Sequence, residues 1–128
     1  MIKGIEGILV GSQNAEKLAD FYKKVVGLKV TFEAVMGEGK DEADFYIFEM
    51  KGCSLYISDH SKIKGKSKNP DRIIFNLEVD NIEKEFKKIV KAGVKKVAPI
   101  HHVEGYGYIA TLEDLDNNYF QLVQIKES

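Results

Sequence analysis

The chain has 128 residues, 44% hydrophobic and 30% charged, a balance typical of one soluble globular domain with a hydrophobic core. The formal net charge of -1 excludes the basic excess of a nucleic-acid-binding protein, and no apolar stretch approaches the roughly 20 residues of a membrane span. A single cysteine, Cys53, excludes an internal disulfide and a multi-cysteine metal site, and the lack of a signal-peptide pattern favours a cytoplasmic location.

The first half of the sequence predicts one helix among short strands. Residues 2–10 are apolar and β-branched, which predicts a strand, and the polar segment 12–14 supplies an N-cap for a helix. Apolar side chains follow at helical spacing as far as Gly27, which can adopt the left-handed conformation that ends a helix. Further strands are predicted over residues 28–35, 45–50 and 54–58. The predicted order is therefore β-α-β-β-β.

The second half repeats this order after a polar linker at residues 59–70. A strand is predicted over 73–79, and Asp80 and Asn81 can cap a second helix, with Glu83 completing a capping box and Gly93 ending the helix. The remaining strands are predicted over residues 94–99, 106–112 and 119–125. The chain thus divides into two halves, about 1–58 and 71–126.

The two halves match at a regular spacing, which indicates an internal duplication. The matching positions are Val10 with Val79, Leu18 with Phe86, and Gly27 with Gly93. A ferredoxin-like sandwich has one helix for every two strands, whereas here each helix is followed by three strands. The predicted fold class is therefore α+β, with two tandem βαβββ modules that form curved mixed sheets with the helices outside.

Three motifs resemble those of one superfamily over nearly the whole chain. They are Phe21-Tyr22 followed by Val25-Val26-Gly27-Leu28, then Val79-Asp80-Asn81-Ile82, and finally the closing hairpin Asp114–Leu122. On the duplicated framework, they resemble the vicinal-oxygen-chelate superfamily of glyoxalases, bleomycin-resistance proteins and extradiol dioxygenases. The closing hairpin departs from the family pattern, with Leu115 in place of proline and Asn117 in place of glycine.

The resemblance implies four inward positions that hold a divalent metal in metal-dependent members. They fall on Gly7, Tyr56, Ile74 and Gln121. Glycine and isoleucine cannot coordinate through their side chains, tyrosine is an uncommon ligand, and one neutral amide does not hold a catalytic divalent ion alone. We therefore expect no metal cofactor. A slip of one residue in the first strand would bring Glu6 inward instead.

The same strand faces predict an organic ligand site with mixed polar and aromatic walls. The candidate ligand-binding residues are Tyr56, Arg72, Asn76, Gln121, Tyr106, Tyr108 and His102. The alternative is that some of these residues fill the core, with Asn76 and Gln121 bonded to each other or to backbone, and that Tyr106 and Tyr108 are strand residues in a dimer interface. His101 and His102 follow Pro99, and adjacent residues of an extended segment point to opposite sides, so both are not expected to bind one ion.

The resemblance implies metal-independent binding of a small organic molecule, as in the bleomycin-resistance branch, and a homodimer that completes the pocket. No nucleic-acid or membrane partner is expected. Whether the protein is an enzyme stays open at this point. The alternatives are a metal-dependent glyoxalase-like lyase, isomerase or dioxygenase, and a structural or regulatory module whose pocket has collapsed.

Overall fold

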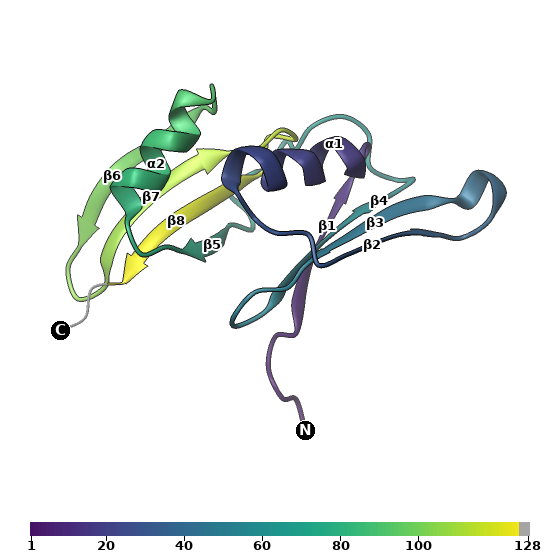
Figure 1. Ribbon diagram of the computed structural model, residues 1–128, viewed down its shortest axis with the longest axis horizontal. Helices are drawn as coiled ribbons and strands as arrows, with labels where there is room; N and C mark the ends of the chain where they lie inside the picture. The colour runs from purple at the N-terminus through teal and green to yellow at the C-terminus, as the bar shows by residue number, and fades with distance from the viewer. Residues whose placement is uncertain (126–128) are drawn as a thin grey trace. The chain divides into compact units, whose positions relative to one another are not determined.

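A computed structural model describes residues 1–125 of the chain. These residues form two compact units, the first spanning Met1–Gly65 and the second beginning at Lys66, so that the boundary lies inside the predicted linker. Each unit contains one four-stranded sheet and one principal helix (Figure 1). None of the helices within residues 1–125 is long and apolar enough to cross a membrane.

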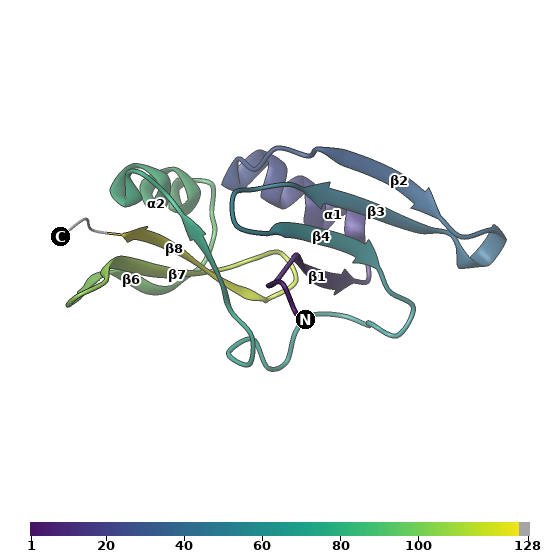
Figure 2. The ribbon, with the colours of Figure 1, turned by 90° about the horizontal axis from the view of Figure 1, so that it is seen from below.

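The first unit is a mixed sheet with a helix between its first two strands. Its elements are β1 (Gly7–Ser12), α1 (Ala15–Asp20), the π-helical turn η1 (Phe21–Val26), β2 (Phe32–Met36), the short 3-10 helix η2 (Gly39–Asp41), β3 (Ala43–Phe48) and β4 (Ser54–Asp59). The strand order is β1-β4-β3-β2, with β1 parallel to β4 and the other pairs antiparallel. The β2–β3 hairpin, with η2 at its tip, extends past the helix (Figure 2).

The second unit repeats this topology. Its elements are β5 (Phe75–Glu78), α2 (Ile82–Lys91), β6 (Lys96–Val103), β7 (Gly107–Glu113) and β8 (Tyr119–Ile125). The strand order is β5-β8-β7-β6, and β5 is parallel to β8 while the other pairs are antiparallel. Because each strand occupies the same place in its sheet as its counterpart, the prediction of two tandem βαβββ modules is confirmed.

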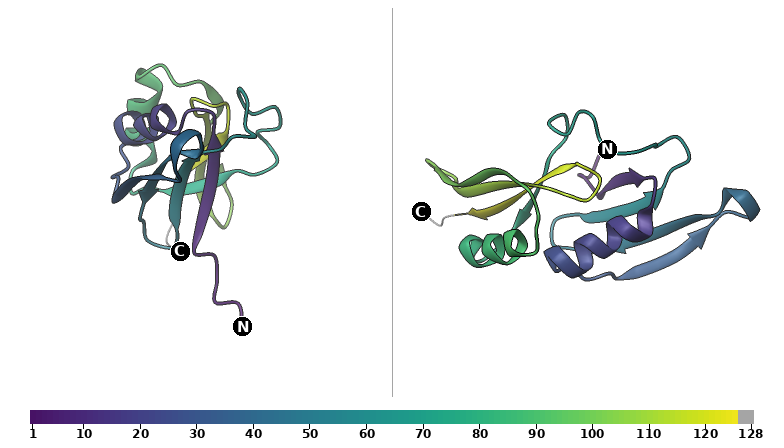
Figure 3. Two further views of the ribbon diagram at one scale, coloured as in Figure 1. Left: turned by 90° about the vertical axis from the view of Figure 1, so that its right-hand side faces the viewer. Right: turned by 90° about the horizontal axis from the view of Figure 1, so that it is seen from above.

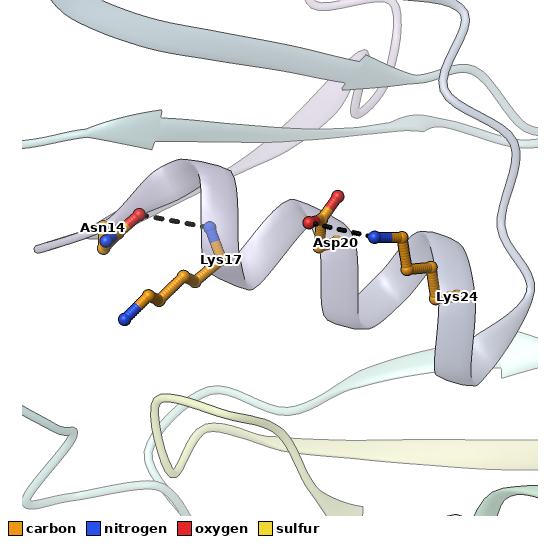
Figure 4. A network of polar contacts seen from close by, with 4 residues as sticks. All are labelled: Asn14, Lys17, Asp20 and Lys24. Atoms are coloured by element: carbon orange, nitrogen blue, oxygen red, sulfur yellow. Dashed lines mark hydrogen bonds and ion pairs between the residues drawn. The ribbon is translucent and has the colours of Figure 1, made fainter.

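Local chemistry at the ends of the first helix explains its limits. The Asn14 side chain accepts a hydrogen bond from the Lys17 backbone N–H at 3.1 Å, which satisfies one free donor of the first turn (Figure 4). An ion pair joins Lys24 to Asp20 at 3.4 Å one turn apart. Gly27 ends the π-helical turn with φ 93, a left-handed conformation that glycine adopts without a Cβ penalty.

Each helix covers one face of its own sheet and forms a core there (Figure 3). In the first unit, α1 and η1 contribute Ala15, Leu18 and Tyr22, and the strands contribute Phe48, Leu55 and Ile57, all nearly or fully buried. In the second unit, the buried set is Ile82 and Ile89 from α2 with Leu77, Ala110, Leu112, Phe120 and Leu122 from the strands. The opposite face of each sheet carries no helix, and we call it the helix-free face.

Several predicted boundaries are wrong for physical reasons. The first strand begins at Gly7 rather than Ile2, because its parallel partner β4 begins at Ser54, opposite Gly7. The strand predicted over 28–35 is observed as β2, Phe32–Met36. The predicted end of the second half at residue 126 lies outside the described residues.

Two details of the second half also differ from expectation. Asn81, not Asp80, caps α2, since its side chain accepts from the Lys84 N–H at 3.1 Å, so the predicted capping box with Glu83 is wrong. Strand β6 continues past Pro99 to Val103, which places both His101 and His102 within it. Pro99 is tolerated because β6 is an edge strand and its pairing is irregular between Ala98 and His101.

Candidate functional site

The helix-free face of the first unit is largely apolar, with most of its residues half-buried and three apolar side chains exposed. Residues paired directly across a sheet share a face. The register therefore places together Gly7, Leu9 and Gly11 of β1, Ser54, Tyr56 and Ser58 of β4, Phe45 and Ile47 of β3, and Phe32, Ala34 and Met36 of β2. The side chains of Leu9, Phe32 and Met36 are 61%, 52% and 54% exposed. Exposed apolar surface of this kind marks a site of binding or assembly.

Tyr56 lies at the centre of this face, directly over Gly7. A Cβ added at Gly7 would lie 2.1 Å from Cε2 of the Tyr56 ring, so only glycine leaves room for the ring. The ring stacks on Phe45, with centroids 5.8 Å apart and planes at 26°. The Tyr56 hydroxyl donates a hydrogen bond to the carboxylate of Glu6. Gly7 and Tyr56 thus share a face as predicted.

Glu6 reaches this face without the one-residue slip considered from the sequence. It precedes β1, so the alternation of the strand does not constrain its side chain. The hydrogen bond to Glu6 raises the pKa of the Tyr56 hydroxyl above its ordinary value of 10.0, and burial and the negative charge of Glu6 act in the same direction. Tyr56 is therefore a neutral hydrogen-bond donor at neutral pH, oriented by a carboxylate.

The helix-free face of the second unit carries a row of polar side chains. Asn76 of β5, Gln121 of β8 and Thr111 of β7 are direct partners across the three strands. The Gln121 amide Nε2 donates to the Thr111 hydroxyl at 3.0 Å. Thr111 is buried at 6% exposure, Gln121 is half-buried, and Asn76 is exposed. The row is therefore buried at Thr111 and reaches solvent at Asn76.

The sequence reasoning predicted Asn76 and Gln121 but missed Thr111. The register confirms that Asn76 and Gln121 share a face, as the alternation of their strands indicated. Gln121 bonds Thr111, not Asn76, so the alternative in which the two amides satisfy each other is wrong. The available signal for Thr111 was that it is the one aliphatic hydroxyl in the apolar run Ile109–Leu112.

Two other candidates lie on the opposite face of the second sheet. His102 and Tyr108 are direct partners between β6 and β7, and their rings lie 5.2 Å apart. Tyr108 is also the partner of Gln124, whose side chain accepts from the backbone N–H of Ile82 in α2. Both rings therefore occupy the face that α2 covers. Of the two histidines, His101 shares the helix-free face, as the partner of Ile109.

The remaining candidates lie outside the strands. Arg72 is exposed in the segment before β5, where its backbone N–H donates to the Asn69 carbonyl at 3.1 Å. Tyr106 is half-buried in the turn before β7, where its N–H donates to the Val103 carbonyl at 3.0 Å. The structure does not assign either side chain to the polar row or to the helix-free face of the first unit, which we call the Tyr56 face.

The side chains at the four family positions do not fit a divalent metal. Gly7 supplies no ligand, and the Tyr56 ring fills the space next to it. Ile74, immediately before β5, has only an aliphatic side chain, and Gln121 is a neutral amide already engaged with Thr111. Across residues 1–125, no three His, Cys, Asp or Glu side chains gather closely enough to hold a metal ion.

Comparison with known proteins identifies the family. The sequence profile of the Glyoxalase/Bleomycin resistance protein/Dioxygenase superfamily matches residues 4–122. The chain belongs to this superfamily. The resemblance deduced from the three motifs is thereby confirmed, although no curated protein sequence matches the chain.

Solved structures with low sequence identity share the fold. A glyoxalase/bleomycin resistance protein/dioxygenase domain from Frankia sp. EAN1pec superimposes with a TM-score of 0.76 at 16% identity, covering 98% of this chain and 100% of that one. The antibiotic-binding protein TnmS3 from Streptomyces sp. CB03234 gives 0.69 at 20% identity, covering 98% of each chain. A mutant of the fosfomycin resistance protein FosX from Listeria monocytogenes, in complex with Mn(II) and a dihydroxypropylphosphonic acid, gives 0.69 at 18% identity, covering 96% of this chain and 93% of that one.

Proposed function

We propose that this superfamily member binds small organic molecules on the helix-free face of each unit, without a metal ion. The observation that carries the proposal is the Tyr56 ring, which covers Gly7 and stacks on Phe45 at 5.8 Å. Two of the positions that the family resemblance assigns to metal ligands here form an aromatic surface, with the Tyr56 ring over Gly7. A flat apolar molecule would stack on this surface and hydrogen-bond to the polar groups beside it.

The surroundings of Tyr56 favour an organic ligand over an inorganic one. Leu9 and Phe32 are more than half exposed on the same face, so a bound apolar molecule would remove their surface from water, with a gain of roughly 25 cal/mol per Å². The Glu6 carboxylate beside the Tyr56 hydroxyl supplies the polar element that fixes the orientation of a ligand. The relatives support the same class, since TnmS3 is described as an antibiotic-binding protein.

Metal-dependent catalysis is the alternative function, and the FosX mutant, which shares the fold, is in complex with Mn(II). Gly7 and Ile74 of this chain supply no side-chain ligand to a metal ion, which disfavours that alternative. A homodimer and a cytoplasmic location, both expected from the sequence, stay predictions. Light scattering after size exclusion tests the first.

Native mass spectrometry of the purified protein tests the proposed function. We expect a retained or added planar organic molecule to bind one-to-one and to quench the tyrosine fluorescence of this tryptophan-free chain. Tyr56→Ala should weaken binding at least tenfold. Tyr46→Ala is the matched control, because Tyr46 is also half-buried but pairs with Ile57, on the helix-covered face.

Metal analysis of the same sample tests whether binding is independent of a metal ion. One equivalent of a divalent metal retained after extensive dialysis would contradict metal-independent binding. Equal losses of affinity in the Tyr56 and Tyr46 variants would contradict the assignment of the ligand to the Tyr56 face.

A further inference from the structure

We propose that the side chains of Gln121 and Asn76 bind a neutral amide-type group of a ligand, in which an N–H lies beside a C=O, as in a lactam, imide or carboxamide. Thr111 is the positioning residue that orients the Gln121 side chain. The inference rests on the proposed function, since it names the chemistry that the helix-free face of the second unit would recognise.

The hydrogen bond to Thr111 engages the nitrogen end of the Gln121 amide. The Nε2 group donates to the Thr111 hydroxyl at 3.0 Å, so the carbonyl oxygen is the end left for a ligand. Thr111 is 6% exposed, and a hydrogen bond shielded from water holds its partners more firmly than an exposed one. Gln121 therefore offers an acceptor, which calls for a donor on the ligand.

Asn76 supplies the complementary group one strand away. It is the direct partner of Gln121 across β5 and β8, and neighbouring strands lie about 4.8 Å apart. Within residues 1–125, no hydrogen bond engages the Asn76 amide or the Gln121 carbonyl oxygen. The Asn76 amide can therefore donate to an acceptor on the ligand.

The two amides together prefer a neutral ligand group with adjacent donor and acceptor. A ligand N–H would donate to the Gln121 carbonyl oxygen while the ligand C=O accepts from the Asn76 amide. Both protein groups are uncharged, so a carboxylate would leave the Gln121 oxygen facing a second acceptor. A ligand without the N–H would likewise leave that half-buried oxygen unsatisfied, which is costly.

A matched pair of probes tests the inference. The bicyclic lactam isoquinolone and its N-methyl derivative share one planar framework and one carbonyl group, and methylation replaces the N–H donor with a methyl group. Isothermal titration calorimetry should show the lactam binding about tenfold more tightly to the wild-type protein, a difference of about 1.4 kcal/mol. Asn76→Asp should weaken both compounds, because both carry the carbonyl group that the Asn76 amide would bind.

Variants at Thr111 separate positioning from simple stability. Thr111→Val keeps the shape but removes the acceptor, so the Gln121 amide can turn and the preference for the lactam should fall at least threefold. Thr111→Ser should restore the preference, and an amide-proton NMR spectrum verifies that each variant is folded.

Three results would overturn the inference. They are equal affinities of the two probes for the wild-type protein, an unchanged preference in Thr111→Val, and no binding of either probe. The proposed function fails separately, by the native mass spectrometry and metal analysis described for it.

Discussion

At the scale of single residues, Gly7 and Tyr56 are best understood as one feature. The Tyr56 ring can lie flat across β1 because Gly7 has no Cβ, and in that position it reaches both Phe45 and the Glu6 carboxylate. A position that the family resemblance assigns to a metal ligand is here shaped for an aromatic ring.

The close approach of Gly7 and Tyr56 predicts strong coupling between them. In Gly7→Ala the new Cβ meets the ring at 2.1 Å, so the ring must leave Phe45 and Glu6, and we expect a loss of about 1–2 kcal/mol of unfolding free energy. In a Tyr56→Ala background the same change should cost less, because only the 3.1 Å approach of the new Cβ to the Ser54 carbonyl oxygen remains. Urea denaturation of the four proteins measures the coupling, and an equal cost in both backgrounds would show that the ring does not depend on Gly7.

The hydrogen bond between Tyr56 and Glu6 predicts a pH dependence above pH 10. The pKa of Tyr56 is raised in the folded protein, so above its ordinary value of 10.0 the unfolded chain loses this proton first. The contribution of Tyr56 to stability is therefore complete below pH 10 and is lost as the pH rises through the folded-state pKa. Ultraviolet titration should show a late-ionising Tyr56 phenolate, and Glu6→Gln should move its transition back toward 10.

Tyr46 provides the internal control for that titration. Its pKa is also raised, by burial first and by the charge of Asp44 second. Glu6→Gln should leave the Tyr46 transition unchanged. A shift of both transitions would mean that the substitution acts through the general charge of the chain.

At the scale of elements, both units use the same device to join the start of the helix to the sheet. An asparagine caps each helix, and a side chain from the last strand of the unit accepts the backbone N–H of the first helical residue. Asp59 of β4 accepts from Ala15 at 2.8 Å, and Gln124 of β8 accepts from Ile82 at 2.8 Å. Asp59 has an additional role, because its second oxygen accepts from the Asp44 N–H of β3 at 2.9 Å.

Because of this difference, removing the Asp59 side chain should lower the free energy of unfolding more than removing the Gln124 side chain. Asp59→Ala leaves two backbone N–H groups without partners and should cost about 2 kcal/mol of unfolding free energy, whereas Gln124→Ala leaves one and should cost about 1 kcal/mol. Chemical denaturation measures both. Glu33→Ala, an exposed change on the edge strand β2, should stay within about 0.5 kcal/mol. Equal costs for Asp59 and Gln124 would show that the link to β3 contributes nothing.

At the scale of the whole molecule, the sequence predicted the repeated βαβββ order but not the contacts between strands. Gly27 and Gly93 end their helices with φ 93 and 97, and β8 spans the predicted residues, since capping and alternation are local properties. The start of β1 depends on where its partner β4 begins, 47 residues away at Ser54, so periodicity alone misplaced it. Thr111 was missed as a site residue because its role comes from a hydrogen bond across the β7–β8 pair, and Glu6 was expected to reach the site only through a slip in register, whereas it does so through a hydrogen bond to Tyr56 of β4.

The duplicated architecture predicts that damage to one core stays within its own unit. Ile57 in β4 and Ile89 in α2 are both fully buried, one in each unit. Ile57→Val and Ile89→Val remove the same methyl group and should each cost about 0.5–1.5 kcal/mol. Because each core consists of side chains from one sheet and its own helix, hydrogen exchange followed by mass spectrometry should speed up mainly in residues 1–65 for the first variant and from residue 66 onward for the second. Equal acceleration in both units by either variant would show that the two cores open together as one cooperative structure.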